Sequence, residues 1–170
     1  NYASHVVHLQ ELHSGLVARG VEPAKISVFA SDGEDPAPDL ATLEASTHAD
    51  AWLLRGTALE RLLPVQRTTN TVWPETELYP ATRASLETWV GEVGRRLDAG
   101  DTLLVYVTDH GLPGDDLPDE AQIALWRESM DAEALSAVLG GLDPDVRVIL
   151  AMSQCYAGAF DQVIERRPNS

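Results

Sequence analysis

Two short stretches of the sequence place reactive side chains directly behind runs of apolar residues. The first, LLVYVTDHGLPG at 103–114, carries His110 and Gly111, and the second, VRVILAMSQCYAGAF at 146–160, carries Cys155, the only cysteine. Cysteine attacks carbonyl carbons as its thiolate, and a nearby imidazole can take the thiol proton or hold it as an ion pair. A histidine and a cysteine that meet in space would therefore supply a nucleophile and its base.

Attack on an amide creates a tetrahedral oxyanion, which preorganised N–H donors must stabilise. Gly111 has no side chain, so we expect its N–H to approach a substrate oxygen unhindered, with the N–H of Cys155 as the second donor. We expect Gly158 to let the chain turn tightly after the nucleophile. A lone cysteine near a strand end is usually only a small buried hydrophobe, so the prediction depends on the pair occurring together.

The elements that must position these residues alternate along the chain. Apolar spacing predicts helices at 3–19, at about 82–98, after an Asp131 cap and in the tail after Phe160, and strands at 26–30, 102–107 and 146–152, with 121–126 as a short strand or hairpin arm. Residues 40–80 give no clear pattern. This order predicts one α/β layered domain with a mostly parallel sheet. The unbroken apolar runs predict strands that are covered on both faces.

A helix between strands 102–107 and 146–152 allows the two strands to run parallel and to be neighbours, about 4.8 Å apart. His110 and Cys155 each lie three residues past the end of one of these strands. Since open α/β sheets bind ligands at the carboxyl ends of their strands, we expect the two side chains to meet at that edge.

The composition limits the other classes of function. The chain has 170 residues, 44% of them hydrophobic, and a net charge of -15, so direct nucleic-acid binding is not expected. No run is long enough for a membrane span, and localisation stays open, with the cytoplasm favoured. One cysteine allows neither an internal disulfide nor a cysteine-based zinc cluster, and no carboxylate pattern completes a metal site beside His5, His8 and His13.

Nucleotide and serine-hydrolase signatures are also missing from the sequence. Neither GxGxxG nor GxxxxGK[ST] occurs, which argues against a flavodoxin-like binding domain with an incidental cysteine. No GxSxG occurs, which argues against a serine hydrolase.

The blocks LLVYVTDHGLPG and VILAMSQCYAGAF together resemble the caspase-like cysteine peptidases, and among these the legumain family. In that family one strand ends in Asp-His-Gly and a later one in a cysteine followed by small residues and glycine. The opening NYASHVVHLQELHSGLVARGVEPAKISVFASD is similar to the legumain start, where an Asn-Tyr pair begins a helix. The likeness follows most of the chain in order and is weak over 40–80. It implies a three-layer caspase-like fold, with a mostly parallel sheet flanked by helices.

Carried over residue by residue, the resemblance implies roles for five residues. Cys155 would be the nucleophile, His110 the acid and base, and Gly111 part of the oxyanion hole. Asn1 falls where legumains have an asparagine that supports the histidine, and Asp109 matches the aspartate before that histidine. The implied activity is peptide-bond hydrolysis through an acyl-enzyme thioester, without a cofactor.

The departures from the family concern the substrate pocket. Legumains that cut after asparagine have Arg-His where this chain has Ala3 and Ser4, and a glutamate where it has Ser153. We therefore do not expect asparagine specificity. Ser153 should still line the primary pocket, since it lies just before the nucleophile, and a neutral pocket would accept small or apolar residues.

The expected partners are a protein or peptide substrate and either a small-subunit-like C-terminal piece or a second protomer. We expect the domain to be the large-subunit-like part, incomplete at both ends, with completing strands before residue 1 and after Ser170. The Arg- and Ala-rich, Lys-poor composition suggests a bacterial member. Two alternatives remain: a transamidase, in which an amine resolves the acyl-enzyme, and a non-catalytic domain that keeps the fold as a scaffold.

Overall fold

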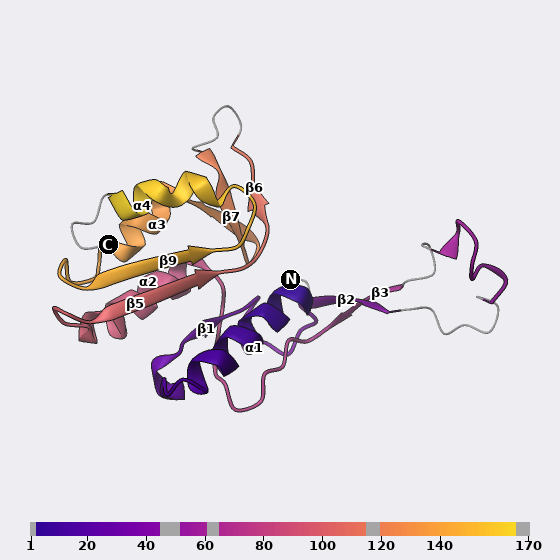
Figure 1. Ribbon diagram of the computed structural model, residues 1–170, viewed down its shortest axis with the longest axis horizontal. Helices are drawn as coiled ribbons and strands as arrows, with labels where there is room; N and C mark the ends of the chain where they lie inside the picture. The colour runs from indigo at the N-terminus through magenta and orange to yellow at the C-terminus, as the bar shows by residue number, and fades with distance from the viewer. Residues whose placement is uncertain (1–2, 45–51, 61–64, 115–119, 166–170) are drawn as a thin grey trace.

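The computed structural model describes residues 3–44, 52–60, 65–114 and 120–165, which form a mixed α/β structure (Figure 1). Its α-helices are α1 (Ala3–Val17), α2 (Arg83–Glu92), α3 (Ala132–Leu139) and α4 (Asp161–Glu165). Its strands are β1 (Val28–Phe29), β2 (Leu40–Glu44), β3 (Val65–Thr69), β4 (Leu78–Tyr79), β5 (Thr102–Val107), β6 (Gly111–Leu112), β7 (Gln122–Leu125), β8 (Glu128–Asp131) and β9 (Arg147–Met152).

The two apolar runs form the central strand pair. β5 and β9 are parallel and in register over their whole length, from Thr102 opposite Arg147 to Val107 opposite Met152. The predicted neighbouring, parallel strands are therefore confirmed. The connection between them carries β6, β7, β8 and α3, which supplies the long crossover that a parallel pair needs.

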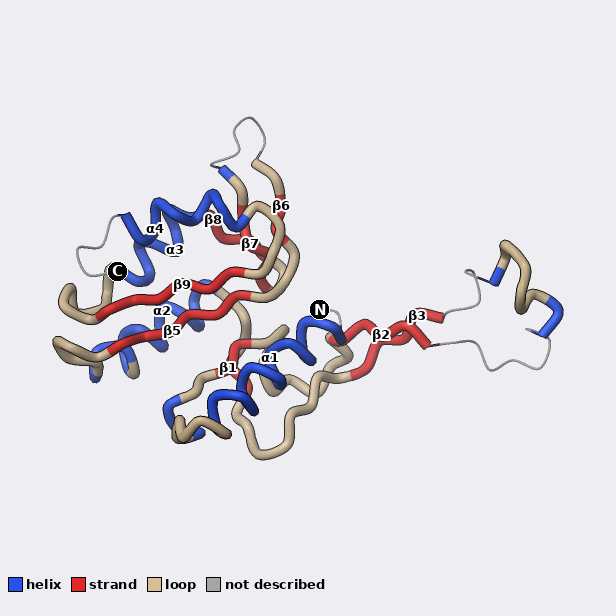
Figure 2. The backbone as a smooth tube through the Cα atoms, viewed as in Figure 1, coloured by secondary structure: helices blue, strands red, loops and turns tan. Residues whose placement is uncertain are grey.

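The strands do not join into one mostly parallel sheet. Within the described ranges they form four small sheets, of which β1–β4 and β5–β9 are parallel and β2–β3 and β6–β7–β8 are antiparallel. β1 and β4 are only two residues long, so their ladder is short. Residues 40–80, which gave no clear pattern, contain β2, β3 and β4. Figure 2 shows β2 and β3 extending away from the helices.

Among the described residues, packing covers only one face of the β5–β9 pair, so the expectation of two buried faces was wrong. Leu103 and Val105 face the main core with their register partners Val148 and Leu150, and Val148 is 2% exposed. On the other face Leu104 is 41% exposed and its partner Ile149 48% exposed. Alternate side chains point to opposite faces of a strand, and the helices of the core pack on only one of them.

The main core lies between this face, β7, β8 and the helices. Its largest fully buried side chains are Phe160, Met130, Val148 and Val163. A second, smaller cluster of Val28, Ala30 and Leu78 lies around β1 and β4. The two regions are connected by Trp89 of α2, whose Nε1 donates to Ser27 Oγ at 2.9 Å.

The helix ends follow local capping signals. Asp131 caps α3 as predicted, because its carboxylate accepts from the N–H of Ala134 at 2.7 Å. α2 is shorter than predicted and is followed by a 3-10 turn at Gly94–Arg96. A Cβ at Gly94 would lie 2.6 Å from the Leu142 side chain, so this turn packs closely on the core. None of the helices described is long and apolar enough to cross a bilayer.

Candidate active site

The loops that follow β5 and β9 are in direct backbone contact. A Cβ built on Gly111 would lie 1.8 Å from the carbonyl oxygen of Cys155 and 2.6 Å from its carbonyl carbon. Only glycine permits this approach, because real Cβ atoms are not found below 3.0 Å from such atoms. The glycine behind the histidine therefore packs against the backbone of the cysteine, at the carboxyl ends of two adjacent parallel strands.

The N–H of Gly111 does not donate to the neighbouring strand. The N–H of Ala124 donates to the carbonyl of His110 at 2.9 Å, and Gly111 lies opposite Ile123. Opposite residues of an antiparallel pair alternate between bonded and non-bonded, so Gly111 and Ile123 form a non-bonded pair. The Gly111 N–H therefore faces away from β7, on the outer edge of β6.

The backbone directly after the cysteine is strained. Tyr156 has a φ of 60°, in the left-handed region that costs a residue with a side chain roughly 1–2 kcal/mol. The expectation that Gly158 would make the tight turn was wrong: it lies in the 3-10 turn Ala157–Phe160 outside that region, and a Cβ there would meet nothing within 4 Å. Strain beside a reactive side chain is a recurrent property of functional sites. Cys155 itself is exposed and unbridged.

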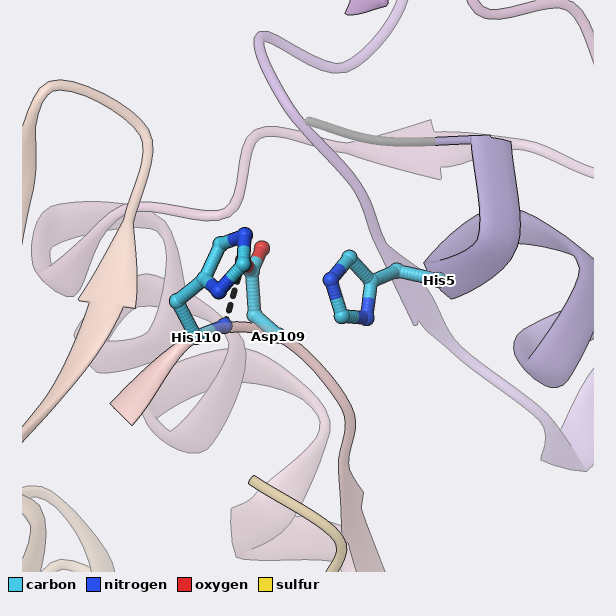
Figure 3. A group of neighbouring side chains, drawn as sticks. All are labelled: His5, Asp109 and His110. Atoms are coloured by element: carbon cyan, nitrogen blue, oxygen red, sulfur yellow. Dashed lines mark hydrogen bonds between the residues drawn. The ribbon is translucent and has the colours of Figure 1, made fainter. Parts of the chain in front are cut away.

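His110 and Asp109 lie beside a histidine of α1. Figure 3 shows the ring of His5 facing the Asp109 carboxylate and the His110 ring. The rings of His5 and His110 are 5.2 Å apart between centroids, in an edge-to-face arrangement. Asp109 Oδ1 also accepts from the backbone N–H of His110 at 2.7 Å, which fixes the start of the loop. The sequence reasoning missed His5, since it lies more than 100 residues from this loop.

Thr108, which follows β5, contacts two histidines of α1. Its Oγ1 lies 3.3 Å from Nδ1 of His5 and 3.2 Å from Nδ1 of His8. The spacing of the two histidines, three residues apart on one helix face, is visible in the sequence, but their shared partner is not. Thr108 therefore holds the His5 ring where it meets Asp109 and His110.

Burial lowers the pKa of His5 from its ordinary value of 6.5. The neighbouring His110, His8 and N-terminal charges lower this pKa further, and Asp109 opposes them. The imidazole of His5 is therefore neutral at pH 7, with one ring nitrogen able to accept a proton or a ligand bond.

Ser153 lies where the sequence places the floor of a substrate pocket. Its N–H donates to Val107 at 3.0 Å, which continues the β5–β9 ladder by one residue. Its hydroxyl donates to the same carbonyl at 3.2 Å and lies 3.4 Å from the Tyr106 hydroxyl. Tyr106 is thus a second polar group beside Ser153 that sequence reasoning missed, since it belongs to the other strand.

Two further candidates are Ser4 and Asn1. Ser4 is exposed in the first turn of α1, beside His5 in sequence, and Asn1 lies outside the described residues. Gln154, next to the cysteine, is 7% exposed, and its Oε1 has no hydrogen-bond partner among the described residues.

Comparisons of the chain with protein-family models, with curated proteins and with solved structures find no match. The arrangement offers an exposed thiol, an imidazole at the adjacent strand end, and a glycine N–H that is turned away from β7. These are the parts that acyl transfer through a cysteine needs.

Proposed function

We propose that this chain is a cysteine peptidase of the caspase-like, legumain type. In this proposal Cys155 is the nucleophile and His110 the general base and acid, at the carboxyl ends of the parallel β5–β9 pair. The observation that carries the proposal is the backbone contact between Gly111 and Cys155, which joins the two strand ends at one edge.

The reaction would proceed through two acyl transfers. His110 takes the proton of Cys155, and the sulfur attacks the carbonyl carbon of the scissile amide. The C–N bond breaks as His110 returns the proton to the leaving amine, which leaves a thioester on the sulfur. Water then attacks the thioester with His110 again as base, and the products are a carboxylic acid and the free thiol.

Two backbone N–H groups would stabilise the oxyanion of each tetrahedral intermediate. The N–H of Gly111, which faces away from β7, would be one donor, and the N–H of Cys155 would be the second. The loss of one such donor typically costs about 10²–10³ in kcat. Asp109 would hold the loop by accepting from the N–H of His110, and Asn1, by the resemblance alone, would support the imidazole.

The primary pocket would be neutral and polar at its base. It would include the hydroxyls of Ser153 and Tyr106, which lie 3.4 Å apart, and, by the resemblance alone, Ser4, where legumains have a histidine. We therefore propose cleavage after small or apolar residues in a limited set of protein substrates, not after asparagine.

The test is cleavage of a peptide library by the full chain, with Cys155→Ala and His110→Ala as controls. Removal of a member of such a catalytic unit should lower kcat by at least about 10³. The residue before the cut identifies the pocket, and Ser153→Glu should shift the preference toward residues that pair with a carboxylate.

A transamidase uses the same side chains and differs only in the acceptor. Product masses in the presence of an added amine or amino-terminal peptide separate the two: hydrolysis gives a free acid, and transfer gives a new amide. Absence of any product with either acceptor, in a chain that is folded, would overturn the catalytic proposal in favour of a scaffold.

A further inference from the structure

A second arrangement shares His110 with the proposed catalytic pair. One ligand atom from each of His5, Asp109 and His110 lies within 4.8 Å of the other two, and the first two residues are partly buried (Figure 3). We propose that these three side chains bind a divalent transition-metal ion of the zinc class. The sequence showed no completed metal pattern, since the ligands come from α1 and from the loop after β5.

The donor set selects the kind of metal. Two imidazoles and one carboxylate are typical zinc ligands, and three protein ligands leave a fourth position open. Calcium and magnesium prefer oxygen ligands throughout, so they fit this set poorly. In a tetrahedral site with bonds of about 2.1 Å the ligand atoms are about 3.4 Å apart, so binding needs only a closure of about 1.4 Å or less.

The residues behind the ligands have the arrangement that metal-binding histidines use. Nδ1 of His5 contacts Thr108 Oγ1 at 3.3 Å, which leaves Nε2 as the ring nitrogen for the metal. The hydroxyl can accept from His5 Nδ1–H and donate to Nδ1 of His8, which it contacts at 3.2 Å. Such outer partners fix the ring tautomer and orientation, and their loss typically costs about 10–100-fold in metal affinity.

The consequence for activity rests on the proposed function. A neutral imidazole has one ring nitrogen with a free lone pair, so a metal bound to His110 would leave its ring unable to accept the proton of Cys155. The metal-bound chain would therefore be an inactive peptidase, and removal of the metal would restore the base. Cys155 does not belong to the group of three ligands, so the site differs from simple capture of metal by the thiol.

The binding test uses Zn²⁺ and the full chain carrying Cys155→Ala, which removes the thiol as a competing ligand. Competition with a chromogenic chelator should show one zinc per chain. Addition of His5→Gln to this background should weaken binding at least about tenfold, since a direct ligand contributes no less than an outer partner. The matched control is His13→Gln, a histidine of the same helix whose ring lies 5.2 Å from the Trp73 ring and outside the group of three, which should leave the affinity close to that of its background.

Two results would overturn the site. One is equal zinc affinity with and without His5. The other is loss of zinc binding in Cys155→Ala together with unchanged binding when His5→Gln is made alone, in a chain that keeps Cys155. That result would assign the metal to the thiol. Circular dichroism of each variant before titration excludes a folding defect as the cause of lost binding.

The activity test separates this proposal from the peptidase proposal. On a peptide that the metal-free chain cleaves, the zinc concentration for half inhibition should rise at least about tenfold in His5→Gln. Zinc binding as described without any peptide cleavage would overturn the peptidase and leave the metal site standing. Cleavage with zinc binding unaffected by His5→Gln would overturn the metal site and leave the peptidase standing.

Discussion

Replacement of Gly111 by alanine tests the contact on which the proposed active site depends. The substitution adds one methyl group and leaves the proposed nucleophile and base untouched. That methyl would lie 1.8 Å from the Cys155 carbonyl oxygen. Because the obstacle is backbone, no side chain can rotate away to make room.

The size of the effect follows from the required displacement. Real Cβ atoms stay beyond 3.0 Å, so this contact must lengthen from 1.8 Å to at least 3.0 Å, or by about 1.2 Å. A misplacement of about 1 Å in a catalytic arrangement costs on the order of 10²-fold in rate. Overpacking of this kind also typically costs about 1–3 kcal/mol of stability. We expect Gly111→Ala to lower kcat/KM about 100-fold or more.

The assay is kcat/KM on the best library peptide, measured well below the unfolding midpoint of each variant. Gly158→Ala is the matched control, since it lies three residues past the cysteine and its new methyl would meet nothing within 4 Å. This control should keep the parent's activity and stability. A folded Gly111→Ala chain with activity within a few-fold of the parent would refute the reasoning, because the strand ends would then not need their close contact.

Three further substitutions test stability. Burial and the neighbouring Asp39 carboxylate raise the pKa of Asp32. The fold therefore favours the protonated carboxyl. This stabilisation is fully present below the ordinary pKa near 3.8 and is lost as the pH rises through the raised pKa. Asp32→Asn should therefore raise the unfolding temperature at about pH 7 more than at about pH 4, measured with a chelator present; an unchanged pH profile would contradict this. Asp131→Ala removes the α3 cap and should cost about 1 kcal/mol in urea unfolding, whereas an unchanged midpoint would show that the cap contributes nothing. Gln154→Met replaces a buried amide whose Oε1 lacks a partner in the described chain and should raise stability by up to about 1–3 kcal/mol; a loss of stability would mean that this oxygen is satisfied in solution.

The features that could be predicted from the sequence are local ones. β5 and β9 begin and end where their apolar runs do, apart from one residue at the start of β9, and Asp131 caps α3 through its own carboxylate. Parallel pairing of the two strands followed from the long crossover between them. These features need only the residues of one element, or the length of one connection.

The features that could not be predicted depend on contacts between distant segments. An apolar run predicts a strand but not whether one face or both faces of that strand will be buried. Here Leu104 and Ile149 are exposed. The meeting of His5 with Asp109 requires α1 to lie against the end of β5, which no local pattern encodes.

Glycine was the least reliable guide to local geometry. Gly111 was expected to be needed for access to its N–H, yet its missing Cβ is required first by packing against Cys155. After the nucleophile, propensity pointed to Gly158, while Tyr156 takes the left-handed conformation. Propensity reflects the average cost of a conformation, and surrounding contacts can impose it on another residue.

The central claim is that Cys155 forms a thioester with substrate while His110 acts as its base. The most direct measurement is the intact mass of the full, metal-free chain after acid quenching during turnover of an ester of the best library peptide. The account predicts one acyl group on Cys155, absent from Cys155→Ala and formed far more slowly in His110→Ala. Turnover without an acyl adduct, or an adduct that persists in Cys155→Ala, would contradict it.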